Sequence, residues 1–145
     1  MFSHVLLGTN DLARATKFYD ALLVPLGLAR SHEQDEPGLP GGTGWAEPGR
    51  NAPAFYTHET FDREPATVGN GTMVAFLAPS REAVDLAFRA GLQAGGSDEG
   101  APNDRPHYGD GYYGAYLRDP DGNKVHLVFR GDLPANERGT GSDAT

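Results

Sequence analysis

The sequence contains an internal repeat, because two segments carry the same pattern of residue types at a shift of 69 positions. Residues 3–8 and residues 72–77 are short apolar runs typical of buried strands, and each is followed by a helical pattern. Aligned without a gap, His4 falls on Met73 and Tyr19 falls on Phe88. The repeat predicts two copies of one strand-and-helix unit that bury their apolar faces in a common fold.

The helix of the first copy is predicted over residues 9–23. Asn10 or Asp11 can cap its start, and Pro25 and Gly27 end it. Its apolar residues recur at helical spacing and therefore share one face: Leu12, Ala15, Phe18, Tyr19 and Leu22. The helix of the second copy is predicted over residues 79–90.

Further strands are predicted after each helix. In the first copy they lie around residues 28–32, 44–47 and 52–58, and we interpret the Gly/Pro-rich residues 37–44 as a flexible loop. In the second copy, residues 112–118 and 124–129 are predicted strands, and the turn chemistry of residues 119–122 joins them into a hairpin. The polar residues 131–145 have no apolar period, which predicts a mobile tail.

The composition is typical of one globular domain of 145 residues. A domain of this size buries about 68–70% of its extended-chain surface on folding and needs no structural metal. The absence of cysteine excludes thiolate catalysis and thiolate metal sites. No apolar run approaches the roughly 20 residues that span a bilayer, and the N-terminus lacks a signal-peptide pattern. We therefore expect a soluble, cytoplasmic protein with no membrane partner.

The charge balance is acidic, with 20 acidic and 12 basic residues and a formal net charge of -8. Binding of nucleic acid requires a basic stripe, whereas the basic residues here are scattered, so no nucleic-acid partner is expected. The negative balance favours a cationic small ligand. Four carboxylates in one stretch are predicted to form a solvated acidic loop: Asp98, Glu99, Asp104 and Asp110.

Taken together, these features resemble the vicinal oxygen chelate superfamily, which includes glyoxalase I, bleomycin-resistance proteins and extradiol dioxygenases. The resemblance rests on the repeat, on His4 in the opening strand, on Phe18 and Tyr19 in the helix, and on residues 71–76 and 119–124. It implies an α+β fold of two βαβββ modules that form a curved, half-open mixed sheet. A single domain is expected over residues 1–130, with module one at about 1–66 and module two at about 67–130. The family also implies a homodimer.

In metal-dependent members of this family, the ligands come from the first and last strands of each module. Carried onto this chain, the four positions are His4, Phe55 (or Tyr56, in the alternative register), Met73 and His126. The two imidazoles suit a divalent ion such as Zn, Ni, Mn or Fe. The thioether of Met73 suits Cu(I), and Phe55 offers no donor, so His4 and His126 are one ligand short of a usual site.

A third ligand would have to come from elsewhere in the chain. His107, Glu47 and the pair His58 and Glu59 all lie in or beside predicted loops and have suitable donor atoms. The cavity implied by the resemblance is expected to bind its ligand through residues that are mostly aromatic: Trp45, Phe55, Tyr56, Met73, His107, Tyr108 and Tyr113. For each of them, packing in the core is the alternative.

Two functions of different class are consistent with these residues. The first is a protein similar to the bleomycin-resistance branch, which holds a small molecule in its concave cavity and has at most a weak or degenerate metal site. The alternative is a metal-dependent lyase or dioxygenase in which an ion held by His4 and His126 acts as a Lewis acid. The substitutions at Phe55 and Met73 favour the first function, whereas the two retained imidazoles favour the second.

Overall fold

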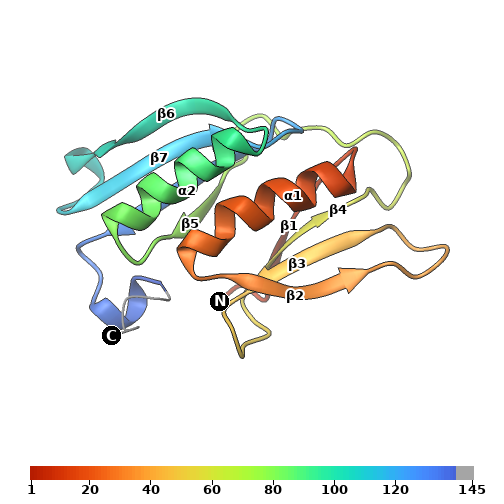
Figure 1. The fold of residues 1–145 in the computed structure, drawn as a ribbon, viewed down its shortest axis with the longest axis horizontal. Helices are drawn as coiled ribbons and strands as arrows, with labels where there is room; N and C mark the ends of the chain where they lie inside the picture. The colour runs from red at the N-terminus through yellow and green to blue at the C-terminus, as the bar shows by residue number, and fades with distance from the viewer. Residues whose placement is uncertain (140–145) are drawn as a thin grey trace.

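A computed structural model describes residues 1–139, which form two modules of the same architecture (Figure 1). The first module contains β1 (His4–Gly8), α1 (Leu12–Leu23), β2 (Ala29–Gln34), β3 (Gly42–Ala46) and β4 (Ala54–His58). The second module contains β5 (Val74–Leu77), α2 (Arg81–Gln93), β6 (Ser97–Asp104), β7 (Tyr112–Arg118) and β8 (Lys124–Arg130). Short 3-10 helices lie at Val24–Leu26, Pro106–Tyr108 and Ala135–Glu137.

Each module contributes one four-stranded sheet, and the two sheets have equivalent strand orders, β1-β4-β3-β2 and β5-β8-β7-β6. The opening strand of each sheet pairs in parallel with the closing strand, and the remaining pairs are antiparallel. The predicted α+β fold of two βαβββ modules with mixed sheets is confirmed.

The two helices lie side by side on the same side of the sheets (Figure 1). Asp11 caps α1 by accepting the backbone N–H of Arg14 at 3.0 Å, and Ser80 caps α2 by accepting that of Ala83 at 3.1 Å. Of the two caps considered for α1, the structure therefore selects Asp11. Gly27 ends the turn after α1 with φ of 85°, a conformation that favours glycine.

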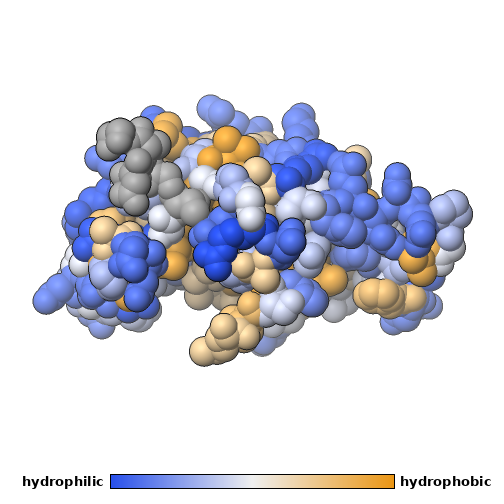
Figure 2. Space-filling view, turned by 90° about the horizontal axis from the view of Figure 1, so that it is seen from below, coloured by the Kyte–Doolittle hydropathy of each residue, from blue (hydrophilic) through white to orange (hydrophobic). Residues whose placement is uncertain are grey.

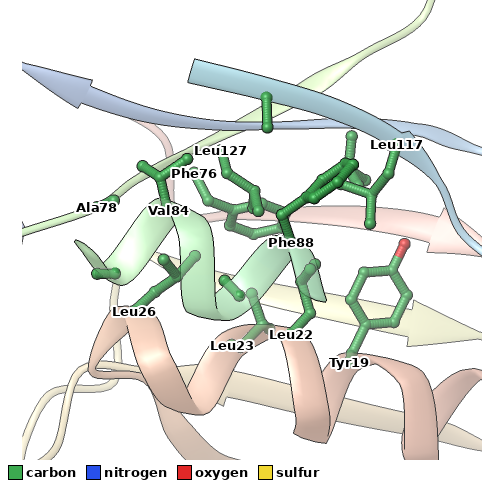
Figure 3. Packing of buried hydrophobic residues seen from close by; sticks show 14 of the residues in the cluster. Tyr19, Leu22, Leu23, Leu26, Phe76, Ala78, Val84, Phe88, Leu117 and Leu127 are labelled. Carbon is green, nitrogen blue, oxygen red and sulfur yellow. The ribbon is translucent and has the colours of Figure 1, made fainter. Parts of the chain in front are cut away.

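One apolar core serves both modules. Side chains of α1, α2 and the second sheet point toward one another in Figure 3, including Leu22, Phe88 and Leu117. The helices approach closely at Gly91, where a Cβ atom would lie 2.9 Å from Leu22 Cδ1 and 2.7 Å from Leu117 Cδ1. A larger residue there would require the side chains of Leu22 and Leu117 to shift.

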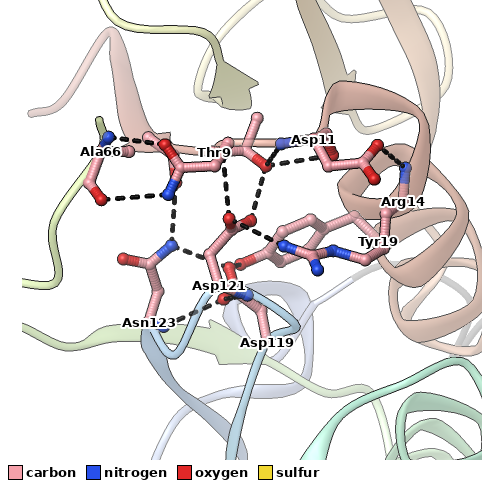
Figure 4. A network of polar contacts seen from close by, with 10 residues as sticks. Thr9, Asp11, Arg14, Tyr19, Ala66, Asp119, Asp121 and Asn123 are labelled. Atoms are coloured by element: carbon pink, nitrogen blue, oxygen red, sulfur yellow. Dashed lines mark hydrogen bonds and ion pairs between the residues drawn. The ribbon is translucent and has the colours of Figure 1, made fainter. Parts of the chain in front are cut away.

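A polar contact joins the turn before β8 to the start of α1 (Figure 4). The carboxylate of Asp121 accepts hydrogen bonds from Thr9 Oγ1 at 2.5 Å and from the backbone N–H of Asn10 at 2.9 Å. It also forms an ion pair with Arg14 at 3.1 Å. Because Asp121 belongs to the second module and its three partners to the first, this contact fixes the modules relative to each other.

The neighbouring carboxylate of Asp119 is buried and fully engaged (Figure 4). It accepts the hydroxyl of Tyr19 at 2.6 Å, the amide of Asn123 at 2.9 Å, and the backbone N–H groups of Asp121 and Asn123. Burial and the carboxylate together raise the pKa of Tyr19 well above its usual value, so its hydroxyl remains a donor. Asn123 also donates to the carbonyl of Gly8 at 3.0 Å, again between modules.

Two strands include residues that were expected in loops. The strand predicted around residues 44–47 is β3 at residues 42–46, and it begins inside the predicted loop because Thr43 and Trp45 are buried while Gly42 and Gly44 leave room for rings from β4. The acidic residues 98–104 belong to β6, which pairs with β7 along its backbone, and Asp110 alone remains in a loop. Backbone pairing here outweighs an unfavourable composition.

Residues 131–139 include the 3-10 helix at Ala135–Glu137, and Arg138 donates to the carbonyls of Leu133 and Gly131 at 2.6 and 3.1 Å. The mobility predicted for 131–145 stays a prediction, and residues 140–145 lie outside the described residues. No helix within residues 1–139 is long and apolar enough to cross a membrane. Figure 2 shows mainly hydrophilic side chains on one face, with small separate hydrophobic groups among them.

We expect Tyr19→Phe to lower the free energy of unfolding by about 1.5–3 kcal/mol, because Asp119 loses a buried charge-assisted hydrogen bond. Urea unfolding followed by circular dichroism measures the change. Tyr108→Phe is the control, since Tyr108 is exposed, and its effect should stay within about 0.5 kcal/mol. Equal losses in the two variants would contradict the role of the Tyr19 hydroxyl.

Candidate functional site

The face of each sheet turned away from the helices is open. On the first sheet, His4 and Leu6 of β1 and Tyr56 of β4 lie on this open face, because Phe55 between them packs in the core. On the second sheet, Tyr112, Tyr116 and His126 lie on it, because the alternate residues Val125 and Leu127 belong to the core. Tyr56 and the three rings of the second sheet come from central strands, whereas His4 and Leu6 come from the edge strand β1.

The strand register decides between the two alternatives left open for the closing strand of module one. Leu6 pairs with Tyr56, and Ala75 pairs with His126. Leu6 and Ala75 are equivalent under the shift of 69 residues. Tyr56 is therefore the counterpart of His126, and the register through Phe55 is wrong because its ring points into the core.

Tyr56 lies within a cluster of rings on the open face of the first sheet. Its ring centroid is 5.3 Å from that of His4 and 5.8 Å from that of His32. The ring reaches across β3 because Gly44 has no side chain, and a Cβ atom there would lie 2.3 Å from Tyr56 Cε1. The cluster thus depends on a glycine in the strand between its members.

His126 is held in one tautomer by its two hydrogen bonds. Its Nδ1 lies 2.8 Å from the carbonyl oxygen of Ala115, which can only accept, so Nδ1 carries the proton. Nε2 must then accept, and the hydroxyl of Tyr112 donates to it at 2.8 Å. The imidazole also stacks on Tyr116, with ring centroids 4.0 Å apart and planes inclined by 11°. Burial, opposed by the Ala115 hydrogen bond, lowers the pKa of His126 from its ordinary value of 6.5.

A cavity of about 950 Å³ lies at the junction of the modules, and we call it the seam cavity. Its lining includes Val5 of β1 and the whole of β5 (Val74–Leu77), together with residues of the 3-10 helix at Ala135–Glu137. Trp45 and Phe55 form its floor, with only 1% and 4% of their surfaces exposed. Glu47, Arg50 and Glu137 are the charged residues of its lining.

Comparison with known proteins supports the resemblance inferred from the sequence. Residues 1–127 match the family model described as the glyoxalase/bleomycin resistance protein/dioxygenase superfamily. The chain belongs to this superfamily. A crystal structure of a glyoxalase/bleomycin resistance protein from Albidiferax ferrireducens T118 is 39% identical with a TM-score of 0.74, and the match covers 90% of this chain and 98% of that one.

Two more distant superfamily structures show the same fold. A glyoxalase-related enzyme from Fulvimarina pelagi is 20% identical with a TM-score of 0.70, and the match covers 97% of this chain and 95% of that one. A putative glyoxalase from Bacillus halodurans is 24% identical with a TM-score of 0.65, covering 88% and 94% of the two chains. No curated protein matches this chain.

Many members of the superfamily bind metals, but the residues present here do not fit a usual divalent site. Within residues 1–139 no group of three or more His, Asp or Glu side chains is arranged to hold an ion. Tyr56 and Met73 occupy two of the four superfamily positions. At the fourth, the lone pair of His126 Nε2 already accepts the hydroxyl of Tyr112.

The residues proposed as a third ligand have other contacts. Glu47 forms an ion pair with Arg50 at 3.3 Å, and Glu59 accepts the backbone N–H of Gly41 at 2.7 Å. The rings of His58 and His107 lie against Phe61 and Tyr108 respectively, with centroids 5.7 and 4.0 Å apart. The structure does not bring any of these side chains together with both His4 and His126.

The residues predicted to bind a ligand lie in different places. Trp45 and Phe55 line the seam cavity, Tyr56 lies on the open face of the first sheet, and Met73 is exposed just before β5. His107 and Tyr108 lie in the exposed 3-10 helix Pro106–Tyr108.

Tyr113 points toward the helices instead of the open face. Its hydroxyl donates to Asp85 of α2 at 2.6 Å, and this bond raises the pKa of Tyr113 to about 12. The neighbouring Tyr112 and Tyr116, which sequence reasoning did not select, are the tyrosines that contact His126. Counting outward from the predicted turn would have found them, because that register pairs Tyr116 with His126.

The His126 imidazole predicts a pH dependence of stability. Because burial lowers its folded-state pKa, the unfolded chain takes up a proton first as pH falls below about 6.5, which favours unfolding. We expect the stability advantage of the wild type over His126→Gln to shrink between about pH 7.5 and pH 5, as measured by urea unfolding. His107→Gln removes an exposed imidazole and serves as the control. A wild-type advantage over His126→Gln that stays constant across this range would contradict the prediction.

Proposed function

We propose that this superfamily member binds a small molecule with an apolar body in the seam cavity. The observation that carries the proposal is the cavity itself, whose volume of about 950 Å³ lies in the range of small-molecule sites. Most of its lining is apolar, and two of its aromatic residues, Trp45 and Phe55, were expected from the sequence to contact a ligand.

The lining also suggests which parts of the ligand are apolar and which are polar. Leu77 keeps 39% of its surface exposed, although it lies beside the buried floor of Trp45 and Phe55. Covering such apolar surface is favourable by about 25 cal/mol for each Å² removed from water. Glu47 and Arg50, which pair at 3.3 Å, offer both signs of charge to a polar group of the ligand.

A homodimer is part of the same proposal. β1 and β5 each end a sheet, so that each has one edge without a strand partner among the described residues. Such edges pair readily with strands of another chain, and both of these edges belong to strands that line the seam cavity. A second copy bound there would lie beside the cavity.

Trp45, the single tryptophan of the chain, can report ligand binding. Ala75→Leu should fill part of the cavity and weaken the affinity for an apolar ligand by about tenfold or more, a change of roughly 1.4 kcal/mol in binding free energy. The probe is 8-anilinonaphthalene-1-sulfonate, followed by energy transfer from Trp45 and by isothermal titration calorimetry.

The matched control is Ala101→Leu, which enlarges another exposed strand alanine outside the cavity lining. This control should bind like the wild type. Absence of saturable binding to the wild-type protein, or equal weakening in both variants, would overturn the proposal for this cavity.

The alternative is a metal-dependent lyase or dioxygenase, and one observation favours it. The Nδ1 of His126 donates to a backbone carbonyl, which is the arrangement that orients metal-binding histidines. An ion would nevertheless have to displace the hydroxyl of Tyr112 from Nε2 and to find its remaining ligands outside the described arrangement.

Elemental mass spectrometry of purified protein dialysed against Zn²⁺, Ni²⁺, Mn²⁺ or Fe²⁺ tests this alternative. A metal enzyme should hold close to one ion per chain, and His4→Ala and His126→Ala should each lose it. From the donors present we expect less than about one tenth of an ion per chain in the wild type. Full occupancy that both variants abolish would establish the alternative function.

A further inference from the structure

We propose that the open face of the second sheet carries a separate binding site for a small oxyanion, formed by Arg105 and Lys124 over the ring of Tyr116. This site goes beyond the proposed function, because the seam cavity does not include any of these residues. The ligand class is a compact carboxylate or phosphate.

The two cations converge on one aromatic ring. The guanidinium carbon of Arg105 lies 4.9 Å from the centroid of Tyr116, and the Nζ of Lys124 lies 5.1 Å from it. Tyr116 is fixed in turn by stacking on the buried ring of His126 at 4.0 Å. The cations therefore lie over a rigid platform, which reduces the entropy lost when a ligand binds.

Arg105 is held in place by uncharged groups. Its Nε donates to the carbonyl of Gly114 at 3.1 Å, and one terminal nitrogen donates to that of Ala101 at 3.2 Å. Gly100 leaves room for it, since a Cβ atom there would lie 3.3 Å from the Arg105 guanidinium. Carbonyl oxygens orient the guanidinium without neutralising its charge, so the positive charge remains for a ligand.

Neither cation forms an ion pair within residues 1–139, although most other arginines of this region do. Glu99, which interacts with Lys124, is paired with Arg118 at 2.8 Å. The pKa of Glu99 is lowered mainly by Arg118 and only in a lesser part by Lys124. In a chain of net charge -8, Arg105 and Lys124 therefore form a local excess of positive charge.

The imidazole beneath the platform responds to the same field. The positive charges of Arg105 and Lys124 add to burial in lowering the pKa of His126, so the ring is neutral near pH 7. The platform thus combines two cations with a neutral stack of rings. A guanidinium fork matches the oxygens of carboxylate and phosphate, and the rings of Tyr112 and Tyr116 offer a flat surface to an attached organic group.

The test uses the ¹⁵N-labelled full chain and two probes, sodium benzoate and inorganic phosphate. NMR follows the Nε–H signal of Arg105 during each titration and, in Arg105→Gln, the backbone amide signal of Tyr116. We expect saturable shifts with a dissociation constant of about 1–10 mM, which added sodium chloride weakens. Arg105→Gln and Lys124→Gln should each weaken binding at least about fivefold, and Lys124→Arg should largely restore it.

The control is Arg89→Gln, which removes the same charge from an exposed position on α2. Its affinity should stay within about twofold of the wild type. Saturation by benzoate alone supports a site for organic carboxylates, and saturation by both probes supports a general oxyanion site. The proposal is overturned if neither probe saturates the protein up to about 50 mM. It is also overturned if Arg89→Gln weakens binding as much as Arg105→Gln and Lys124→Gln do.

The two proposed sites can fail independently. Binding in the seam cavity is read from Trp45, whereas the oxyanion site is read from Arg105, which follows β6, and two strands (β8 and β7) separate β6 from β5. Each variant is first compared with the wild type by its ¹H–¹⁵N spectrum. A variant that does not fold is replaced by Arg105→Met or Lys124→Met, which removes the charge and keeps an apolar stem.

Discussion

The arrangement of this molecule depends on two carboxylates in the turn before β8. Asp119 is buried, and a buried carboxylate is stable only when its oxygens are satisfied, which here requires Tyr19 of the other module. Asp121 adds bonds to Thr9, Asn10 and Arg14. The relative position of the two modules, and with it the width of the seam cavity, therefore follows from a few hydrogen bonds with strict geometry.

The two modules have kept their backbone and diverged in their open faces. At equivalent positions the first module has Tyr56, whose ring lies over Gly44, and the second has His126, whose ring stacks with those of Tyr112 and Tyr116. The first face carries two histidine rings near one tyrosine, and the second face carries two cations over one tyrosine. A repeat in sequence thus supports two different surfaces, as expected when a fold and its sites change independently.

The sequence predicted the features that depend on neighbouring residues. The helices, the choice of two caps for α1 and the hairpin around Asp119 follow from local spacing and turn chemistry, and the repeat together with the superfamily resemblance predicted the fold. The choice of Tyr56 over Phe55, the pairing of the acidic residues 98–104 in β6 and the seam cavity depend on packing between distant segments, which local patterns do not encode. Net charge does not show where charges gather, because Arg105 and Lys124 lie over one ring in a chain of net charge -8.

The bonds of Asp121 join residues that are 107 to 112 positions apart in the chain. Asp121 is synthesised after the whole of the first module. Until then, the hydroxyl of Thr9 and the backbone N–H of Asn10 must form hydrogen bonds with water. The first module can form its sheet early, but its final geometry is set only when the last hairpin emerges. The final arrangement of the modules therefore requires synthesis of the chain at least as far as Asp121.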